Sequence, residues 1–272
     1  MKKILCPVDF SEVSTNGMEY ASHLAKELKA SLSLLHVRTS IWPEAIQLEE
    51  EVGKSNEAIR ERLSIFTEEI KNEFGILCDY RLEQTTSTFE DTVASLAHPY
   101  DLVVMGTNGA DTYYQYVFGS NSFHVTEKSK CPVIIIPEGC TYRSVDQMVY
   151  AYDPETNPIF SIDQLKKLSL PMHTALRVLH IVKENQSGEA ERKMEILRDV
   201  LKAKVPSNIS LSFDYRYSNE VSWAVDQYMK DNRGDMLALS FHHRSLIAEL
   251  FKENVVKQIS MVAEYPLFVF WH

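Results

Sequence analysis

Three glycines and a serine follow a short apolar run in the first half of the chain. The run is LVVM at 102–105, and after it come Gly106, Gly109, Gly119 and Ser120. A short apolar run bounded by turn residues is typical of a strand buried on both faces, and the residues after Gly119 favour a helix. Glycine lets the backbone approach an anion closely, and a helix N-terminus offers unpaired N–H groups with a partial positive charge. Together these features predict a cradle for phosphate groups.

The composition is that of an ordinary globular protein, and the charge excludes one class of partner. The 272 residues suffice for one large domain or two smaller ones. The net charge of -10 argues against nucleic acid as the main partner, because binding along a phosphate backbone requires a basic surface. A single nucleotide in a pocket remains compatible, since backbone N–H groups can hold its phosphates locally.

The sequence has no obvious targeting or metal motif. No apolar run of about 18 residues is present, so we expect no membrane span. The segment after Met1 enters a strand-like stretch too early for a signal-peptide core, which favours a cytoplasmic protein. The four cysteines lack zinc-ligand spacing and are predicted to be buried, reduced thiols. They are Cys6, Cys78, Cys131 and Cys140.

Apolar runs and helical periodicities alternate along the first half. The expected strands cover 3–8, 31–37, 77–82, 102–105 and 133–136. The expected helices begin at Ser14 or Thr15, cover about 56–74 with a stop at Gly75, cover 88–97 with Thr88 as a candidate N-cap, and follow Ser122. Alternating strands and helices predict a parallel, doubly wound α/β sheet.

The second half repeats the first. Two spacings recur, each between an aspartate at one end of a strand and a histidine or proline further along the chain. They are 27 positions for Asp9–His36 and Asp153–His180, and 31 positions for Asp101–Pro132 and Asp235–Pro266. This pattern indicates an internal duplication. Small and polar residues at 138–143 mark a boundary, so we expect one domain over 1–140 and a second over 141–272.

The spacing Gly-x2-Gly-x9-Gly-Ser resembles the ATP-binding signature of the universal stress protein family, and the duplication resembles the tandem form of that family. It is neither Gly-x-Gly-x-x-Gly nor a Walker A loop. The resemblance implies two tandem Rossmann-like domains of the HUP type, which are similar to adenine nucleotide alpha hydrolases. Each would have a five-stranded parallel sheet in the order 3-2-1-4-5, with ligand bound where the order reverses between strands one and four.

The same resemblance implies an adenine nucleotide, ATP or else ADP or AMP, in the first half. The acid after strand one would contact the ribose, the end of strand two the adenine, and the glycine loop with its serine the phosphates. When the family's contacts are transferred to the matching positions of this sequence, the implied nucleotide-binding residues are Pro7, Val8, Asp9, Val37, Met105, Gly106, Asn108, Gly109, Gly119, Ser120, Asn121 and Ser122.

The loop also departs from the family pattern. Ala110-Asp111 stand where a basic residue is common, and 84–88 lacks the expected glycine. An acid beside a triphosphate is unfavourable unless a metal such as Mg²⁺ bridges them.

Several of these residues have simpler explanations. Without the glycine motif, Asp9 is explained as a turn or helix-start residue. His36 lies within an apolar strand, which favours a hydrogen-bonded core histidine over a catalyst. The tyrosine-rich run at 113–118 could stack on a base, although packing against the other half or a second chain is favoured.

The second half lacks the glycine motif. Ser240, Phe241, His242 and His243 match Gly106 to Gly109, and Glu253-Asn254 match Gly119-Ser120. Side chains would fill the phosphate space, so this half is predicted not to bind ATP. A shared metal site at His242-His243 is disfavoured, because adjacent residues of an extended segment point apart.

The leading hypothesis is a cytoplasmic tandem universal stress protein. One half binds ATP as a signal or stabilising ligand, and the other packs against it as an intramolecular pseudo-dimer through the last strand of each half, 133–136 and 267–270. No catalytic residue is assigned, and any hydrolysis is expected to be slow. A homodimer of the whole chain is also compatible with the sequence. The alternatives are a nucleotide-independent adaptor in stress signalling and an enzyme of the related nucleotide-binding group.

Overall fold

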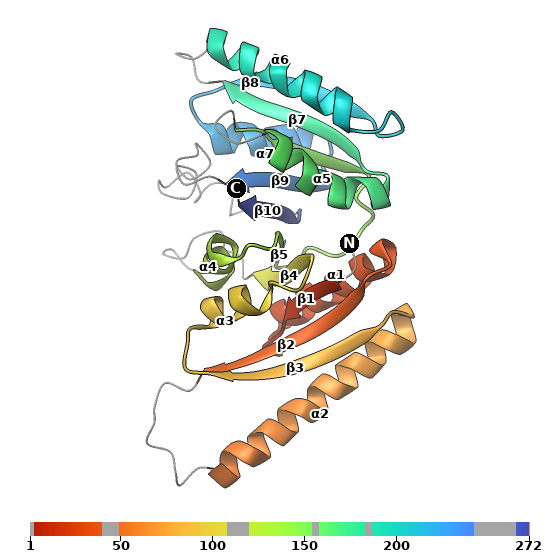
Figure 1. Ribbon diagram of the computed structural model, residues 1–272, viewed down its shortest axis with the longest axis vertical. Helices are drawn as coiled ribbons and strands as arrows, with labels where there is room; N and C mark the ends of the chain where they lie inside the picture. The colour runs from red at the N-terminus through yellow and green to blue at the C-terminus, as the bar shows by residue number, and fades with distance from the viewer. Residues whose placement is uncertain are drawn as a thin grey trace.

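The computed structural model describes residues 3–39, 49–107, 120–153, 158–182, 187–241 and 265–271. The first half contains β1 Lys3–Pro7, α1 Glu12–Leu28, β2 Ser31–Thr39, α2 Glu49–Phe74, β3 Cys78–Thr85, α3 Phe89–Leu96, β4 Leu102–Thr107, α4 Ser120–Lys128 and β5 Val133–Pro137. The second half contains β6 Gln147–Ala151, α5 Pro158–Met172, β7 Ala175–Val182, α6 Ser187–Lys204, β8 Leu211–Tyr217, α7 Val221–Asp231, β9 Met236–Phe241 and β10 Leu267–Trp271 (Figure 1).

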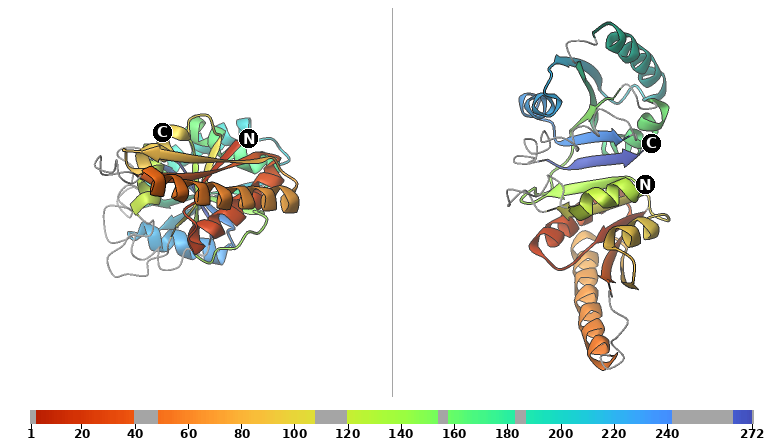
Figure 2. Two further views of the ribbon diagram at one scale, coloured as in Figure 1. Left: turned by 90° about the horizontal axis from the view of Figure 1, so that it is seen from below. Right: turned by 90° about the vertical axis from the view of Figure 1, so that its left-hand side faces the viewer.

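All ten of these strands form one sheet in the order β3-β2-β1-β4-β5-β10-β9-β6-β7-β8. Neighbours within each half are parallel, so the predicted order 3-2-1-4-5 is confirmed twice. Helices cover both faces, with α2 at one end of the sheet and α6 at the other (Figures 1 and 2). This is a doubly wound α/β fold used twice.

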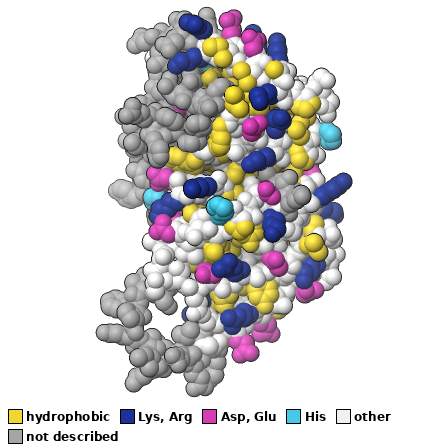
Figure 3. Space-filling model, viewed as in Figure 1, with side chains coloured by type: hydrophobic (Ala, Val, Ile, Leu, Met, Phe, Trp, Pro, Cys, Tyr) yellow, Lys and Arg dark blue, Asp and Glu magenta, His cyan; other side chains and the backbone are white. Residues whose placement is uncertain are grey.

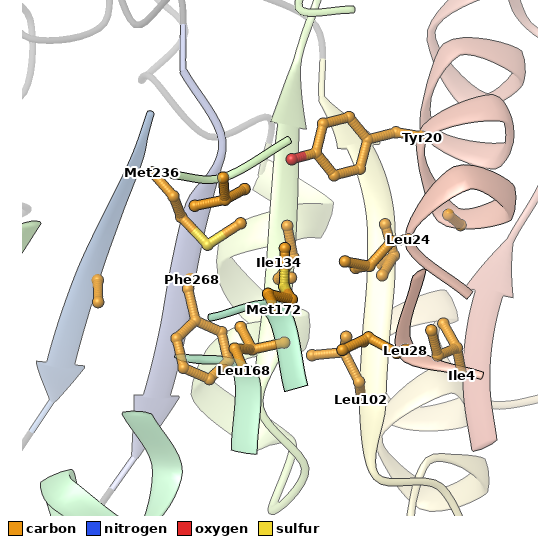
Figure 4. Close-up of a cluster of buried hydrophobic side chains, with 14 of the residues drawn as sticks. Ile4, Tyr20, Leu24, Leu28, Leu102, Ile134, Leu168, Met172, Met236 and Phe268 are labelled. Atoms are coloured by element: carbon orange, nitrogen blue, oxygen red, sulfur yellow. The ribbon is translucent and has the colours of Figure 1, made fainter. Parts of the chain in front are cut away.

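The two halves meet at β5 and β10, which pair antiparallel. Phe268 lies opposite Ile134 in this pairing, and both side chains are fully buried. Leu24 of α1 and Leu168 of α5 approach the same strands from one side (Figure 4). Buried side chains of both halves therefore form one continuous hydrophobic cluster, and burial of this kind is the main stabilising contribution to a fold.

Local capping explains where the helices begin. α1 starts at Glu12, and the prediction of a start at Ser14 or Thr15 was wrong by almost one turn, because Ser11 is the N-cap and its hydroxyl accepts from the Ser14 N–H at 3.1 Å. Thr88 caps α3, as predicted. α2 begins at Glu49 instead of near 56, and Gly75 follows its end with φ +68°.

Two glycines allow α1 to lie directly against the end of β4. A Cβ built at Gly17 would lie 2.5 Å from the backbone nitrogen of Gly106, and one built at Gly106 would lie 2.1 Å from the carbonyl oxygen of Val13. Both distances are far below van der Waals contact, so only glycine fits at either position. This backbone contact fixes the first turns of α1 beside the carboxyl end of β4.

In each half, a histidine of the second strand forms a hydrogen bond to a backbone carbonyl just after the first strand. His36 Nδ1–H donates to the Val8 carbonyl at 2.8 Å, and His180 Nδ1–H donates to the Tyr152 carbonyl at 3.1 Å. Loss of hydration lowers the pKa of both imidazoles below the usual value, although the carbonyl bond opposes this shift. The interpretation of His36 as a hydrogen-bonded structural histidine fits this geometry.

The cysteine prediction is confirmed, and the surface carries mixed charge. All four thiols are free and buried, and burial raises the pKa of Cys131 to about 12 and that of Cys140 to about 11. On the face seen in Figure 3, acidic and basic side chains are interspersed. Within the ranges described above, no helix combines the length and the apolar character needed to cross a bilayer.

The glycine contact makes a prediction for stability. Gly17→Ala should lower the free energy of unfolding by about 1–3 kcal/mol, because the new Cβ forces α1 away from β4. Gly53→Ala is the matched control, since that helical glycine has open space around it, and it should raise stability by about 0.5–1 kcal/mol. Urea unfolding measures both variants. Equal effects of the two substitutions would contradict the packing role.

The histidine bonds predict a pH dependence of stability. An unfolded histidine titrates near about 6.5, whereas the buried His180 resists protonation, so the unfolded chain binds more protons as the pH falls below that value. The free energy of unfolding should therefore decrease from pH 7 to pH 5.5. His180→Gln should flatten this slope, and the control His98→Gln, at an exposed position, should leave it unchanged. An unaltered slope in His180→Gln would refute the assignment.

Candidate functional site

The candidate site lies at the carboxyl ends of β1 and β4, which are neighbours in the sheet. Leu5 pairs with Val103 in this register, and the Lys3 N–H donates to Asp101 Oδ2 at 3.1 Å. The connection after β1 leads to β2 on one side, while β4 lies on the other side, so the strand order reverses here. Open α/β sheets bind ligands at such a reversal. The fold thus brings the carboxyl end of β1 next to the carboxyl end of β4, although the two strands are far apart in sequence.

Asp9 stands in a tight turn between β1 and α1. Asp9 Oδ1 accepts from the Ser11 N–H at 3.0 Å and from the Ser11 hydroxyl at 2.6 Å, and the Asp9 N–H donates to Ser14 Oγ at 3.2 Å. Loss of hydration alone would raise the pKa of Asp9, but the hydrogen bonds from Ser11 and Ser14 hold that pKa below its usual value. An ionised, exposed carboxylate therefore lies at the edge, with acceptor capacity remaining for a ligand hydroxyl.

Gly106 lies at this edge for a reason that differs from the sequence-based one. From the sequence alone, we expect the missing side chain of Gly106 to let a phosphate approach the backbone closely. In the structure, the space that a Cβ would occupy is filled by the Val13 carbonyl at the start of α1. The described structure therefore requires glycine at position 106 for the packing of β4 against α1. The same packing places the Asp9 turn next to the end of β4.

Apolar side chains lie beneath the edge on the side of α3 and α4. Met105 is buried and belongs to one cluster with Leu5 and Leu35, and Val37 packs against that cluster while remaining partly exposed. Pro7 and Val8 are buried at the end of β1. An adenine ring needs apolar contacts of this kind. The resemblance assigns the adenine contact to the backbone at the end of strand two, and that assignment of Val37 stays a prediction.

The helix that follows the glycine loop is α4. It begins at Ser120 and contains nine residues, of which Asn121 is exposed and Ser122 is 3% exposed. Lys128 Nζ of α4 lies 2.8 Å from Asp91 Oδ1 of α3, so an ion pair links the two helices. Asn108, Gly109 and Gly119 lie outside the described residues, so the structure gives no geometry for the middle of the loop.

Sequence reasoning missed three residues of this site. The sequence predicts Ser14 only as a helix start, yet its hydroxyl accepts a hydrogen bond from the Asp9 N–H at 3.2 Å. Gly17 is not among the predicted site residues, although a glycine inside a helical pattern signals close packing. Phe10 adopts φ +67°, and no local signal predicts this conformation for an aromatic residue.

The equivalent edge of the second half is filled by side chains. Asp153, which matches Asp9, is 2% exposed, whereas Asp9 is exposed. Ser240, which matches Gly106, is fully buried, and its Oγ lies 2.8 Å from the Tyr150 hydroxyl. The Tyr152 ring packs edge-on against His180 at 5.8 Å between centroids. This part of the second half resembles a core more than a ligand site.

No metal-binding cluster is found in the part of the chain that the structure describes. No group of three or more His, Cys, Asp or Glu side chains there has an arrangement that could hold an ion.

Comparison with known proteins finds relatives of this chain in one family. The model of the universal stress protein family matches residues 1–137. Universal stress protein Slr1230 of Synechocystis sp. is 20% identical over 292 residues, covering 99% of this chain and 100% of that protein. Universal stress protein YxiE of Bacillus subtilis is 29% identical over 144 residues, covering 49% of this chain and 97% of that protein.

The fold agrees along the whole chain with a solved relative. The crystal structure of a universal stress protein from Archaeoglobus fulgidus has a TM-score of 0.74 at 18% sequence identity, covering 99% of this chain and 98% of that chain. The similarity of that structure extends over both halves, while the family model covers half of the sequence. On these grounds the chain belongs to the universal stress protein family.

Proposed function

We propose that this protein binds an adenine nucleotide, ATP in the first place, at the carboxyl edge of β1, β2 and β4, and that the bound nucleotide is a stress-response signal and not a substrate for rapid turnover. The observation that carries the proposal is the adjacency of the ends of β1 and β4, held by the contact between Gly17 and Gly106. It places the ionised Asp9 beside the strand that leads into the glycine loop.

Each part of the nucleotide has a matching group in this proposal. Asp9 accepts a hydrogen bond from a ribose hydroxyl, and Val37 contacts the adenine. Backbone N–H groups of the loop from Gly106 to Gly119 and of the first turn of α4 bind the phosphates. Mg²⁺ between the phosphates and the loop acid Asp111 would offset the repulsion between the two negative groups.

The second half is proposed to be a packing partner without a nucleotide of its own. The buried Ser240, bonded to Tyr150, and the buried Asp153 support this assignment. We place the domain boundary near residue 140. Tyr142, just beyond it, stacks on His23 of α1 at 4.7 Å between ring centroids. The whole chain would then be a cytoplasmic protein with a single nucleotide site, and we assign it no catalytic residue.

Equilibrium dialysis with labelled ATP tests the proposal. We expect about one ATP per chain, with binding lost in Gly109→Val and Gly119→Val, because a side chain would fill the phosphate cradle. Gly53→Ala is the control and should retain binding, since residue 53 lies in α2 with open space around it. At about 100 times the dissociation constant, ATP should stabilise the folded chain by ~2.7 kcal/mol.

Two outcomes would contradict parts of this proposal. Two ATP molecules per chain would refute a second half without nucleotide. No binding, together with no change in thermal unfolding on addition of ATP, would favour the nucleotide-independent adaptor. Mass spectrometry of small molecules that copurify with the chain distinguishes ATP from ADP and AMP.

A further inference from the structure

Phe10 has a backbone conformation that its neighbours must enforce. Its φ of +67° lies in the left-handed region, which is unfavourable for a bulky L-residue. The other described non-glycine residues with positive φ are Lys29, His173 and Arg233, and each follows the end of a helix, where this conformation is common. Phe10 instead follows a strand, so the helix-cap explanation does not apply to it.

Three side chains hold the ring of Phe10. His36 of β2 stacks on it with 4.9 Å between centroids and 24° between planes. Phe66 of α2 packs at 6.0 Å, and the guanidinium carbon of Arg62, one turn earlier on α2, lies 4.1 Å above the ring centroid. Stacking and cation–π contacts of this kind are favourable, and here they offset the unfavourable backbone conformation.

The held ring determines where the neighbouring carboxylate points. Phe10 lies between Asp9 and Ser11, and its left-handed φ folds the chain back so that Ser11 can donate to Asp9 Oδ1 through both its N–H and its hydroxyl. The contacts of the Phe10 ring with His36, Arg62 and Phe66, which we call the clamp, thus fix the side chain of Phe10. The hydrogen bonds of the turn join the two residues on either side of it. The same turn also delivers Ser11 as the N-cap of α1.

The second half supplies a natural comparison. Position 154 corresponds to position 10 and is proline, a residue type whose ring excludes a positive φ. The preceding Asp153 is buried, whereas Asp9 is exposed. An exposed aspartate at the strand end thus occurs together with the aromatic residue in the first half, and both features are missing in the second.

We propose that Phe10 is a positioning residue for nucleotide binding: the clamp formed by His36, Arg62 and Phe66 aims the Asp9 carboxylate at the ribose. This inference rests on the proposed function, because it needs a nucleotide whose ribose meets Asp9. It also makes α2 part of the nucleotide site through Arg62, although that helix contributes no predicted ligand contact.

The test compares ATP with 2′-deoxy-ATP and 3′-deoxy-ATP by isothermal titration calorimetry. In the unaltered chain, the deoxy analogue that lacks the hydroxyl bound by Asp9 should bind about tenfold more weakly than ATP, because a charge-assisted hydrogen bond is lost. In Phe10→Gly this ratio should fall towards one. Glycine tolerates the same φ, so the variant removes the clamp without adding strain.

The ratio separates positioning from a general structural role. A merely structural defect would weaken ATP and its deoxy analogue equally and leave the ratio unchanged. Phe10→Tyr, which keeps the ring, should restore the ratio, and Arg62→Gln, at an exposed position, should lower it in part. Arg60→Gln on the same helix is the control and should have no effect. In an Asp9→Ala background, Phe10→Gly should cause no further change in the ratio.

The outcomes distinguish this inference from the proposed function. If the unaltered chain binds ATP and Phe10→Gly keeps the full discrimination against the deoxy analogue, the positioning role is wrong while the nucleotide site stands. If the unaltered chain binds neither ATP nor its analogues, the proposed function fails and this inference fails with it. If Phe10→Gly does not fold, Arg62→Gln decides alone, and an unchanged ratio in that variant overturns the proposal.

Discussion

The contact between Gly17 of α1 and Gly106 of β4 is the constraint on which the candidate site depends. Two backbones touch there with no room for a single side-chain carbon. Because α1 is fixed in this way, its N-cap Ser11 and the turn that holds Asp9 cannot move away from the end of β4. The geometry at the edge is therefore set by packing inside the fold, before any ligand is considered.

The antiparallel pairing of β5 with β10 explains why a half without the glycine motif can persist. In each half the fifth strand would be an unpaired edge, and an exposed edge strand is an aggregation hazard. Each half covers the edge of the other, and Ile134 and Phe268 bury the junction. The second half is needed for this contact whether or not it holds a ligand. Its site edge could therefore become a buried core around Tyr150 and Ser240.

The strands and the duplication could be predicted from the residues, since buried parallel strands appear as apolar runs and a repeat appears as recurring spacings. The strand order came instead from the resemblance to the family. Helix starts were harder. α2 begins at Glu49, about two turns before the start that its apolar periodicity indicates. Arg38 of β2 donates to Asn56 in the third turn of α2, which is a tertiary hydrogen bond without a local signal. Phe10 is the same case, because its conformation depends on contacts from β2 and α2.

The continuous core has a consequence for how a single nucleotide could act on the whole chain. Buried side chains from α1 and α5 belong to one cluster that crosses the β5–β10 junction, so the halves lack an independent hydrophobic core on that face. Domains that share a core unfold together, and a ligand that binds only the folded state then stabilises the entire unit. Under the proposed function, one site at β1 and β4 would stabilise the surface of the second half as well. A tandem protein with one occupied edge can in this way report nucleotide levels through both halves.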